Sequence, residues 1–258
     1  MRKHALRVLI DHHAEDPQAR SALDRALVDA DAEVRLMGAS GVGPGGFEAI
    51  RRIANDTFLP ANVRADALEK LVKLFPRSQA APALTKALDD PTSAARKVAI
   101  VALGKMRHMP AMSRLVSLAA RPAAEPEEQA CLAQALGRIG DPTSEAALIR
   151  LLAVEDTAVR IAAAHALARV GTASAVEPLS RFSGSLLGGE LNKAAADAIA
   201  KIQARLSRAG GAEGQLAMTD RDSEEGQVSL PVQDGALDLP DPNEPAIQLV
   251  RSKAPVRS

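Results

Sequence analysis

The 258-residue chain has no tryptophan and no tyrosine, and only 2% of its residues are aromatic. It therefore offers little that could stack on a nucleobase or build an aromatic cage. The net charge is zero, whereas a protein that holds a nucleic-acid backbone carries an excess of lysine and arginine. Together these absences make nucleic-acid binding an unfavoured function.

Cysteine is almost absent as well. The single cysteine, Cys131, excludes an internal disulfide bond and fits a reducing compartment. It lies in an alanine- and leucine-rich run, so we interpret it as a small buried hydrophobic residue rather than a reactive thiol. No apolar run is long enough to cross a bilayer, and Arg7 and Asp11 interrupt the run after the basic N-terminus. We expect a soluble cytoplasmic protein with no membrane segment and no secretion signal.

What the chain does contain is a phrase, usually led by arginine, that returns about every thirty residues. Its clearest copies are VRADALEKL from Val63, ARKVAIVAL from Ala95, EQACLAQAL from Glu128 and VRIAAAHAL from Val159. The second position of the phrase, called the anchor below, falls at Arg2, Arg35, Arg64, Arg96, Gln129, Arg160 and Asn192, which are 29 to 33 residues apart. Such a period predicts stacked supersecondary units rather than a globule.

Each unit is expected to form two helices. In the unit with the clearest pattern, the first helix covers about 142–153 and the second 157–170. Asp156 and Glu155 precede the second helix and favour its positive N-terminal end, where an acidic side chain can cap the backbone. Gly140 and Gly171 each follow a second helix, where glycine can adopt a positive φ at least cost.

Two features of the aligned second helices explain why the units stack. The seventh residue after the anchor forms an apolar column: Leu9, Val42, Leu71, Leu103, Leu136, Leu167 and Ile199. The sixth and eighth residues after it are mostly small, which lets neighbouring helices approach closely. A single hairpin of this size buries too little apolar surface to fold alone, so we expect neighbours to share their stability.

These residues resemble the HEAT-repeat family, particularly its short bacterial form in bilin lyases. The resemblance lies in an acidic turn, V-R, an alanine-rich helix and A-L-G-x-I-G before D-P, as in the segment 135–142. Gln129 and Asn192 depart from the arginine position, and the second helix near 41–46 is shortened by glycine. The family implies that the repeat arginines bond acidic turn residues of adjacent units; here these arginines are Arg35, Arg64, Arg96 and Arg160.

The fold that we predict is all-α. Residues 1–207 are expected to form an α-solenoid, an armadillo-like superhelix of about six HEAT-type hairpins. Residues 208–258 are expected to form a disordered acidic tail, because 208–250 hold nine acidic residues against two basic ones and are rich in glycine and proline. Three short apolar phrases in the tail, from Gly214, Gly226 and Gly235, are open to interpretation as partner-binding motifs or as chance similarity.

The N-terminal phrase matches a second helix without a first helix before it. Terminal repeats need a polar outer face, yet Ala5, Leu6, Leu9 and Ile10 are apolar. We therefore expect a partner, a second copy of the chain or the tail to cover this end.

Two columns of the second helices are candidates for protein binding. Nine residues after the anchor, five successive units carry a basic residue: Lys73, Lys105, Arg138, Arg169 and Lys201. Cations there complement the helix dipole, but a basic ridge would also attract an acidic partner or the acidic tail in cis. Five residues after the anchor the side chains vary, as expected of a concave binding face: Glu69, Val101, Gln134, His165 and Asp197.

Catalytic, cofactor and metal sites are not indicated. HEAT enzymes similar to deoxyhypusine hydroxylase use His-Glu pairs, and no histidine here is followed by glutamate. His12 and His13 would point about 100° apart on a helix, which makes a shared metal ion improbable. We therefore expect no cofactor, no metal and no enzymatic activity.

The function that the sequence favours is a non-enzymatic scaffold or adaptor that binds another protein through the concave row of second helices. The resemblance implies an alternative, an accessory subunit or lyase-like chaperone for the attachment of a bilin-type cofactor.

Overall fold

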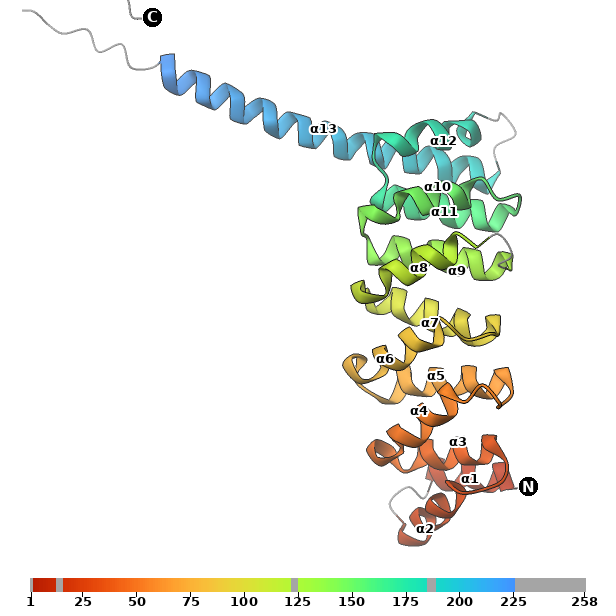
Figure 1. Ribbon diagram of the computed structural model, residues 1–258. Helices are drawn as coiled ribbons and strands as arrows, with labels where there is room; N and C mark the ends of the chain where they lie inside the picture. The colour runs from red at the N-terminus through yellow and green to blue at the C-terminus, as the bar shows by residue number, and fades with distance from the viewer. Residues whose placement is uncertain (1, 13–15, 122–124, 185–188, 226–258) are drawn as a thin grey trace, which may run out of the picture. The chain divides into compact units, whose positions relative to one another are not determined.

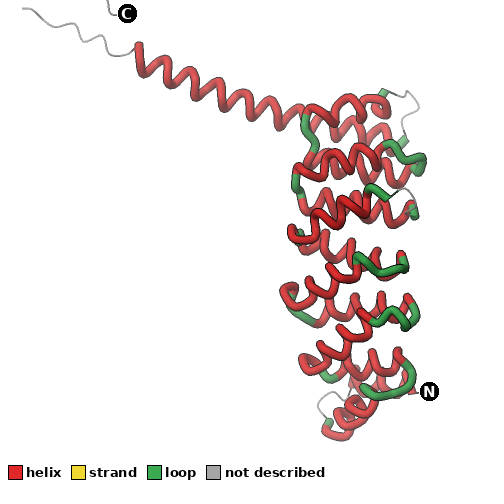
Figure 2. The backbone as a smooth tube through the Cα atoms, in the orientation of Figure 1, coloured by secondary structure: helices red, strands yellow, loops and turns green. Residues whose placement is uncertain are grey.

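A computed structural model describes residues 2–12, 16–121, 125–184 and 189–225. By its internal contacts the chain divides into two units, Met1–Ala212 and Glu213–Ser258. The described residues are helical, and none of them lies in a strand (Figure 2). The fold described below is that of the first unit.

Six helical hairpins follow one another within the described residues, after one further helix (Figure 1). That helix is α1 (Arg2–His12). The first helices of the hairpins are α2 (Pro17–Ala26), α4 (Phe47–Asn55), α6 (Arg77–Ala87), α8 (Met112–Ala119), α10 (Glu145–Leu152) and α12 (Ala173–Ser183). The second helices are α3 (Ala32–Gly41), α5 (Ala61–Leu74), α7 (Ser93–Met106), α9 (Pro126–Ile139), α11 (Thr157–Val170) and α13 (Glu190–Glu225).

The helices form two layers. The helix α1 packs on α3, and α3, α5, α7, α9 and α11 then contact one another in chain order. Among the first helices, α4 contacts α6, α8 contacts α10, and α10 contacts α12. The predicted all-α solenoid of about six hairpins is confirmed.

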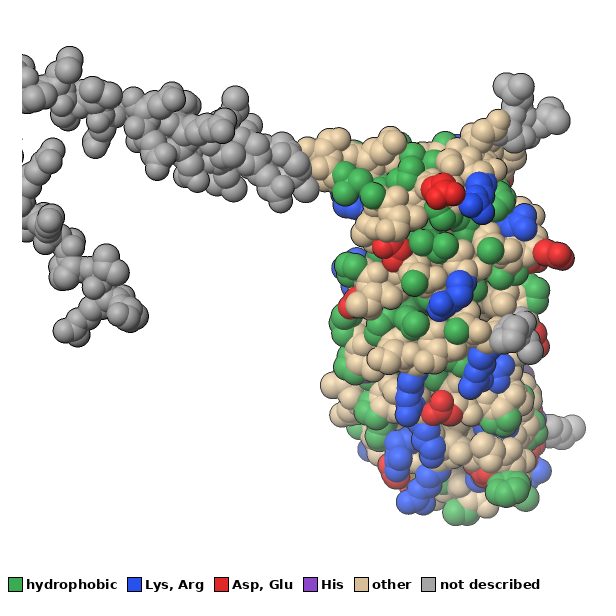
Figure 3. All heavy atoms as spheres, turned by 45° about the horizontal axis from the view of Figure 1, so that its top comes forward, with side chains coloured by type: hydrophobic (Ala, Val, Ile, Leu, Met, Phe, Trp, Pro, Cys, Tyr) green, Lys and Arg blue, Asp and Glu red, His purple; other side chains and the backbone are tan. Residues whose placement is uncertain are grey.

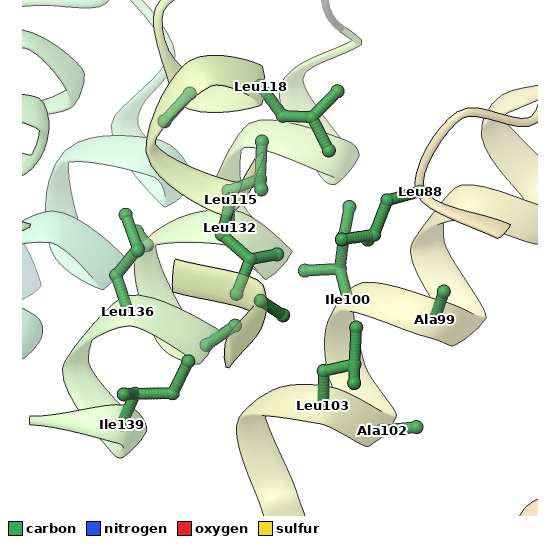
Figure 4. Packing of buried hydrophobic residues seen from close by; sticks show 14 of the residues in the cluster. Leu88, Ala99, Ile100, Ala102, Leu103, Leu115, Leu118, Leu132, Leu136 and Ile139 are labelled. Carbon is green, nitrogen blue, oxygen red and sulfur yellow. The ribbon is translucent and has the colours of Figure 1, made fainter. Parts of the chain in front are cut away.

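The apolar column of the second helices lies between the layers. Leu71, Leu103, Leu136 and Leu167 are fully buried, whereas Leu9, Val42 and Ile199 near the ends are half-buried. Figure 4 shows the labelled leucines and isoleucines of α7, α8 and α9 converging between the helices. One continuous core therefore runs from α3 to α13, because each hairpin supplies apolar contacts to the next.

Neighbouring second helices touch where both carry small residues. A Cβ atom on Gly104 would lie 2.6 Å from the Cα of Ala135, and one on Gly137 would lie 2.7 Å from the Cα of Ala166. In both contacts, the eighth residue after one anchor meets the sixth residue after the next anchor. Glycine costs about 1 kcal/mol of helix propensity relative to alanine, and the close approach explains its presence in both helices.

The ends of the second helices agree only in part with the expectations from the sequence. Asp156 caps α11 as predicted, since its carboxylate accepts hydrogen bonds from the N–H groups of Ala158 and Val159 at 2.8 and 3.1 Å. Gly140 ends α9 with a φ of 83°, also as predicted. The expectation for Gly171 is wrong, because its φ is −64°. Glycine is required there by space instead, since a Cβ would lie 2.6 Å from the carbonyl oxygen of Leu167.

The first helix corrects a second expectation. Leu6 is buried in a small cluster with Leu23, Ala26 and Val34, and Leu9 and Ile10 pack against it. Leu6, Leu9 and Ile10 of α1 are thus packed against α2 and α3, whereas Ala5 of the same helix is exposed. The need for a partner, a second copy or the tail to cover Leu6 and Leu9, inferred from the sequence, is thereby removed.

Helix α13 continues past the point where the sequence predicts helical order to end. It runs from Glu190 to Glu225, beyond Arg208, and contains the apolar phrase that begins at Gly214. No proline occurs in this helix, and a helix that is already formed adds one hydrogen bond for each further residue. The phrases from Gly226 and Gly235 lie outside the described residues.

The anchor arginines connect successive units. Arg64 donates to both carboxylate oxygens of Asp90 at 2.8 Å, and Arg96 donates to those of Glu128 at 2.8 and 2.7 Å. Both acids belong to the following unit. Arg35 donates to the carbonyl oxygens of Asp29 and Ala30 in its own turn, at 2.8 and 2.9 Å.

Arg160 has no carboxylate partner within the described residues. It donates to the carbonyl oxygen of Val154, and its guanidinium carbon lies 5.2 Å from the ring centre of Phe182. Backbone carbonyls and a neighbouring aromatic ring therefore replace the acid at this anchor.

The pair of Arg64 and Asp90 is the most buried of these, with side chains 2% and 5% exposed. Burial raises the pKa of Asp90, but hydrogen bonds from Arg64 and Thr92 lower it more, so the net shift is downward. The charged form of Asp90 therefore stabilises the folded state.

Replacement of Asp90 by alanine is expected to lower the free energy of unfolding by about 3–5 kcal/mol, because it leaves Arg64 buried without its counter-charge. The measurement is a urea unfolding curve. Glu177→Ala is the matched control, since it breaks the exposed ion pair with Arg181 and should shift the midpoint little. Equal shifts in the two variants would contradict the buried pair.

The lowered pKa of Asp90 also predicts a dependence on pH. Its contribution is complete above the ordinary carboxyl pKa of about 4 and is lost as the pH falls toward the lower folded value. The unfolding midpoint should therefore fall less steeply between about pH 5 and 3 in Asp90→Asn than in the parent chain. Parallel curves would show that Asp90 is not responsible.

Gly137→Ala is expected to lower the free energy of unfolding by about 1–3 kcal/mol, because the added methyl group meets the backbone of α11. Gly184→Ala is the control, since nothing lies within 4 Å of a Cβ there and φ is −98°. That substitution should be neutral or stabilising by up to about 1 kcal/mol. Thermal unfolding of both variants tests the close contact.

Candidate protein-binding site

The residues singled out by the two columns all lie on second helices. They are distributed as Glu69 and Lys73 on α5, Val101 and Lys105 on α7, Gln134 and Arg138 on α9, His165 and Arg169 on α11, and Asp197 and Lys201 on α13. All are exposed except Val101 and Arg138, which are half-buried. The structure brings eight of them to two grooves and leaves Asp197 and Lys201 apart, in an ion pair at 2.7 Å.

The larger of these grooves, of about 370 Å³, lies between α5 and α7. Val72, Val98 and Val101 give it an apolar lining, and Glu69, Lys73 and Lys105 stand around it. Val72 occupies the position that is glycine in α7 and α9, and its larger side chain lines the groove.

The second groove, of about 110 Å³, lies between α9 and α11. Its rim is formed by Gln134, Arg138, His165 and Arg169, and its floor by Gly137, Ala162 and Ala166. Its lining contains two guanidinium groups and no acidic residue. Because the floor is made of small side chains, a ligand can come close to the helix backbone.

Basic residues at the two ends of the second helices differ in their partners. Near the N-terminal ends, Lys97 lies 2.6 Å from Glu127, and Arg96 lies 2.7 Å from Glu128. Near the C-terminal ends, Lys73, Lys105, Arg138 and Arg169 form no ion pair within the described part of the chain. Their charge is therefore available to a ligand.

Hollows of greater volume occur elsewhere. One of about 640 Å³ lies between α6 and α8, and one of about 730 Å³ lies beside the turns that precede α9 and α11. In the first, Arg114 is already paired with Asp89 at 3.0 Å. On the face seen in Figure 3, acidic and basic side chains are spread among apolar ones, and no surface of a single sign covers it.

A third hollow, of about 590 Å³, lies across α1, α3 and α5. Its lining combines basic residues such as Lys3 and Arg7 with acidic ones such as Asp11 and Glu33. Lys3 is committed to ion pairs there, with Asp31 at 3.5 Å and with Glu33.

Sequence columns did not identify every residue of the grooves. Val72 and Val98 were missed because the column of Val72 holds mostly small residues and that of Val98 holds residues of mixed type. Lys97, which also lines the larger groove, directly follows an anchor arginine. A search for unit-specific departures from each column would have found Val72.

Cys131 is half-buried against the core, and burial raises the pKa of its thiol. Among the described residues, no group of three or more histidine, cysteine, aspartate or glutamate side chains could hold a metal ion. His13 lies outside them. Within the same residues, no helix combines the length and the apolar character required of a membrane span.

No curated protein matches the chain. An engineered protein solved by the Northeast Structural Genomics Consortium is similar to it, with a TM-score of 0.54, 22% identity, and coverage of 72% of this chain and 96% of that one. At this identity the similarity concerns the fold alone.

Two natural proteins are more distant. The complex of CpcE and CpcF of phycocyanin lyase from Nostoc sp. PCC7120 gives a TM-score of 0.38 at 17% identity, covering 71% of this chain and 94% of the other. Human deoxyhypusine hydroxylase in complex with glycerol gives 0.33 at 18% identity, covering 78% of each chain.

The family comparison concerns the second half of the solenoid. Residues 115–200 match the family model described as HEAT repeats. The matched stretch begins in α8 and ends in α13, and it includes the groove between α9 and α11. The match to HEAT repeats over these residues confirms the resemblance seen in the sequence.

Proposed function

We propose that the protein is a non-enzymatic scaffold that binds another polypeptide across its row of second helices. HEAT repeats form helical scaffolds and commonly mediate protein interactions. The observation that carries the finer proposal is the combination of an apolar groove between α5 and α7 with exposed polar residues on either side of it. Protein-binding surfaces typically have such an apolar centre and a polar rim.

The second helices suit this role because their positions are fixed from behind. Leu68, Leu71, Ile100 and Leu103 bury the opposite face of α5 and α7 in the core. A partner would therefore meet a preorganised surface, which reduces the entropy cost of binding.

Val101→Phe is expected to abolish most of the capture of the natural partner, because the larger side chain fills the groove without changing charge. The loss should be about tenfold or more, as for the removal of a central contact. The measurement is affinity capture from the source cells, with partners quantified by mass spectrometry.

Val28→Phe is the matched control, since Val28 lies 85% exposed in the turn after α2, away from the row. Thermal unfolding of both variants shows whether either one perturbs the fold. Recovery of the same proteins in equal amounts with Val101→Phe and with the parent chain would overturn the proposal.

A further inference from the structure

Four consecutive second helices carry a basic residue at the same position of the repeat, near the C-terminal end of the helix. Lys73, Lys105, Arg138 and Arg169 are each the ninth residue after an anchor. Since α5, α7, α9 and α11 contact one another in order, these side chains form a row, called the cation row below. Its members lie on the rims of the two grooves described above.

The cation row differs in its partners from the basic residues near the N-terminal ends of the second helices, of which Arg35 and Arg160 bond backbone carbonyls. Arg2, Lys3, Arg64, Arg96 and Lys97 all lie in ion pairs with acids of the following unit. No such pair is formed by the row within the described residues. Stacking alone therefore does not neutralise these charges.

Helix dipoles account for only part of this arrangement. The four residues lie in the last turns of their helices, where a cation is favoured. Lys86 of α6 and Arg150 of α10 occupy the same kind of position on first helices. A pure dipole role predicts equal behaviour of the two sets, which makes the first-helix pair a matched control.

The spacing of the row specifies the shape of a ligand. Packed helices lie about 8–10 Å apart, so neighbouring cations are separated by roughly that distance. A polyproline II helix has three residues per turn and rises about 3.1 Å per residue, so every third side chain returns to the same face after about 9.3 Å. A carboxylate at every third residue would therefore meet one cation after another.

We propose that the cation row binds an acidic, proline-containing segment of a partner polypeptide in polyproline II conformation, with a carboxylate at every third residue. This inference rests on the proposed function and adds the chemistry of the partner. Arg138 and Arg169 present planar guanidinium groups that suit two-point binding of carboxylates. The valine-lined groove between α5 and α7 accepts an apolar residue of the same segment.

A peptide suits the surface better than a nucleic acid does. Val72, Val98 and Val101 line the groove beside Lys73 and Lys105, and a phosphate chain would leave these apolar side chains without a partner. Phe47 and Phe75 pack against each other, with ring centres 5.1 Å apart, so they offer no stacking surface. Single-stranded nucleic acids require such aromatic platforms together with cations.

The chain itself contains a sequence of this class. Acidic residues recur at every third position at Asp238, Asp241 and Glu244, with prolines at 240, 242 and 245. These residues lie outside the described ones, and we use their sequence as the probe. A fluorescein-labelled peptide with the sequence of residues 236–247 tests the spacing directly.

The receptor is the full-length chain carrying Asp238→Asn, Asp241→Asn and Glu244→Gln, so that its own copy of the sequence does not compete. Fluorescence anisotropy is expected to show saturable binding that weakens as salt is added. Adding Arg138→Gln and Arg169→Gln should raise the Kd about five- to tenfold, the effect of losing two exposed ion pairs. Adding Lys86→Gln and Arg150→Gln instead should leave the Kd unchanged.

A second peptide, of identical composition with its three acidic residues placed side by side, separates spacing from net charge. It should bind several times more weakly than the probe. Equal Kd values for the two peptides, equal effects of the two double substitutions, or no binding would each overturn the inference. Tighter binding of a thymidine dodecamer than of the peptide would assign the row to nucleic acid instead.

The two proposals fail separately. If partner capture depends on Val101 while the Kd ignores Arg138 and Arg169, the surface binds a protein without carboxylate pairing, and only the present inference falls. If capture does not depend on Val101, the scaffold proposal falls whatever the peptide does.

Discussion

Contact between neighbouring second helices is the constraint on which the rest of the structure depends. Glycine in α7 and in α9 faces alanine in the helix that follows, and behind this contact leucines from both layers close the core. No hairpin completes its own interior, because its apolar faces are shared with the units before and after it. The order of the helices in space is therefore the order of the repeats in the chain.

The two ends of a second helix have different roles. At its N-terminal end an anchor side chain holds the turn of its own unit or of the next one, as in the pairs of Arg64 with Asp90 and of Arg96 with Glu128. At the C-terminal ends of α5, α7, α9 and α11, a basic side chain forms no ion pair within the described residues and is exposed or half-buried. The repeats therefore bond to their neighbours near the N-terminal ends of the second helices and carry unpaired charge near the C-terminal ends.

Features that recur in every unit could be predicted from the sequence. The period gave the hairpins, the leucine column identified the buried face, and the small residues indicated close approach. Features that depend on a single contact could not. Gly171 serves space rather than a positive φ, and α1 buries its apolar face on its neighbours. The candidate site could be predicted in part. The columns located its charged residues, whereas Val72, which lines its larger groove, departs from its column.

The small cluster formed by Leu6, Leu23, Ala26 and Val34 is separate from the main core. In a linear array, a segment whose apolar cluster is separate from the main core can open without loss of the remainder. Helices α1 and α2 with the start of α3 are therefore expected to open before the main core does, although Leu27 and Ala32 still pack against that core. Amide hydrogens there would exchange through sub-global opening, while those of α7, α9 and α11 would wait for the whole array to come apart.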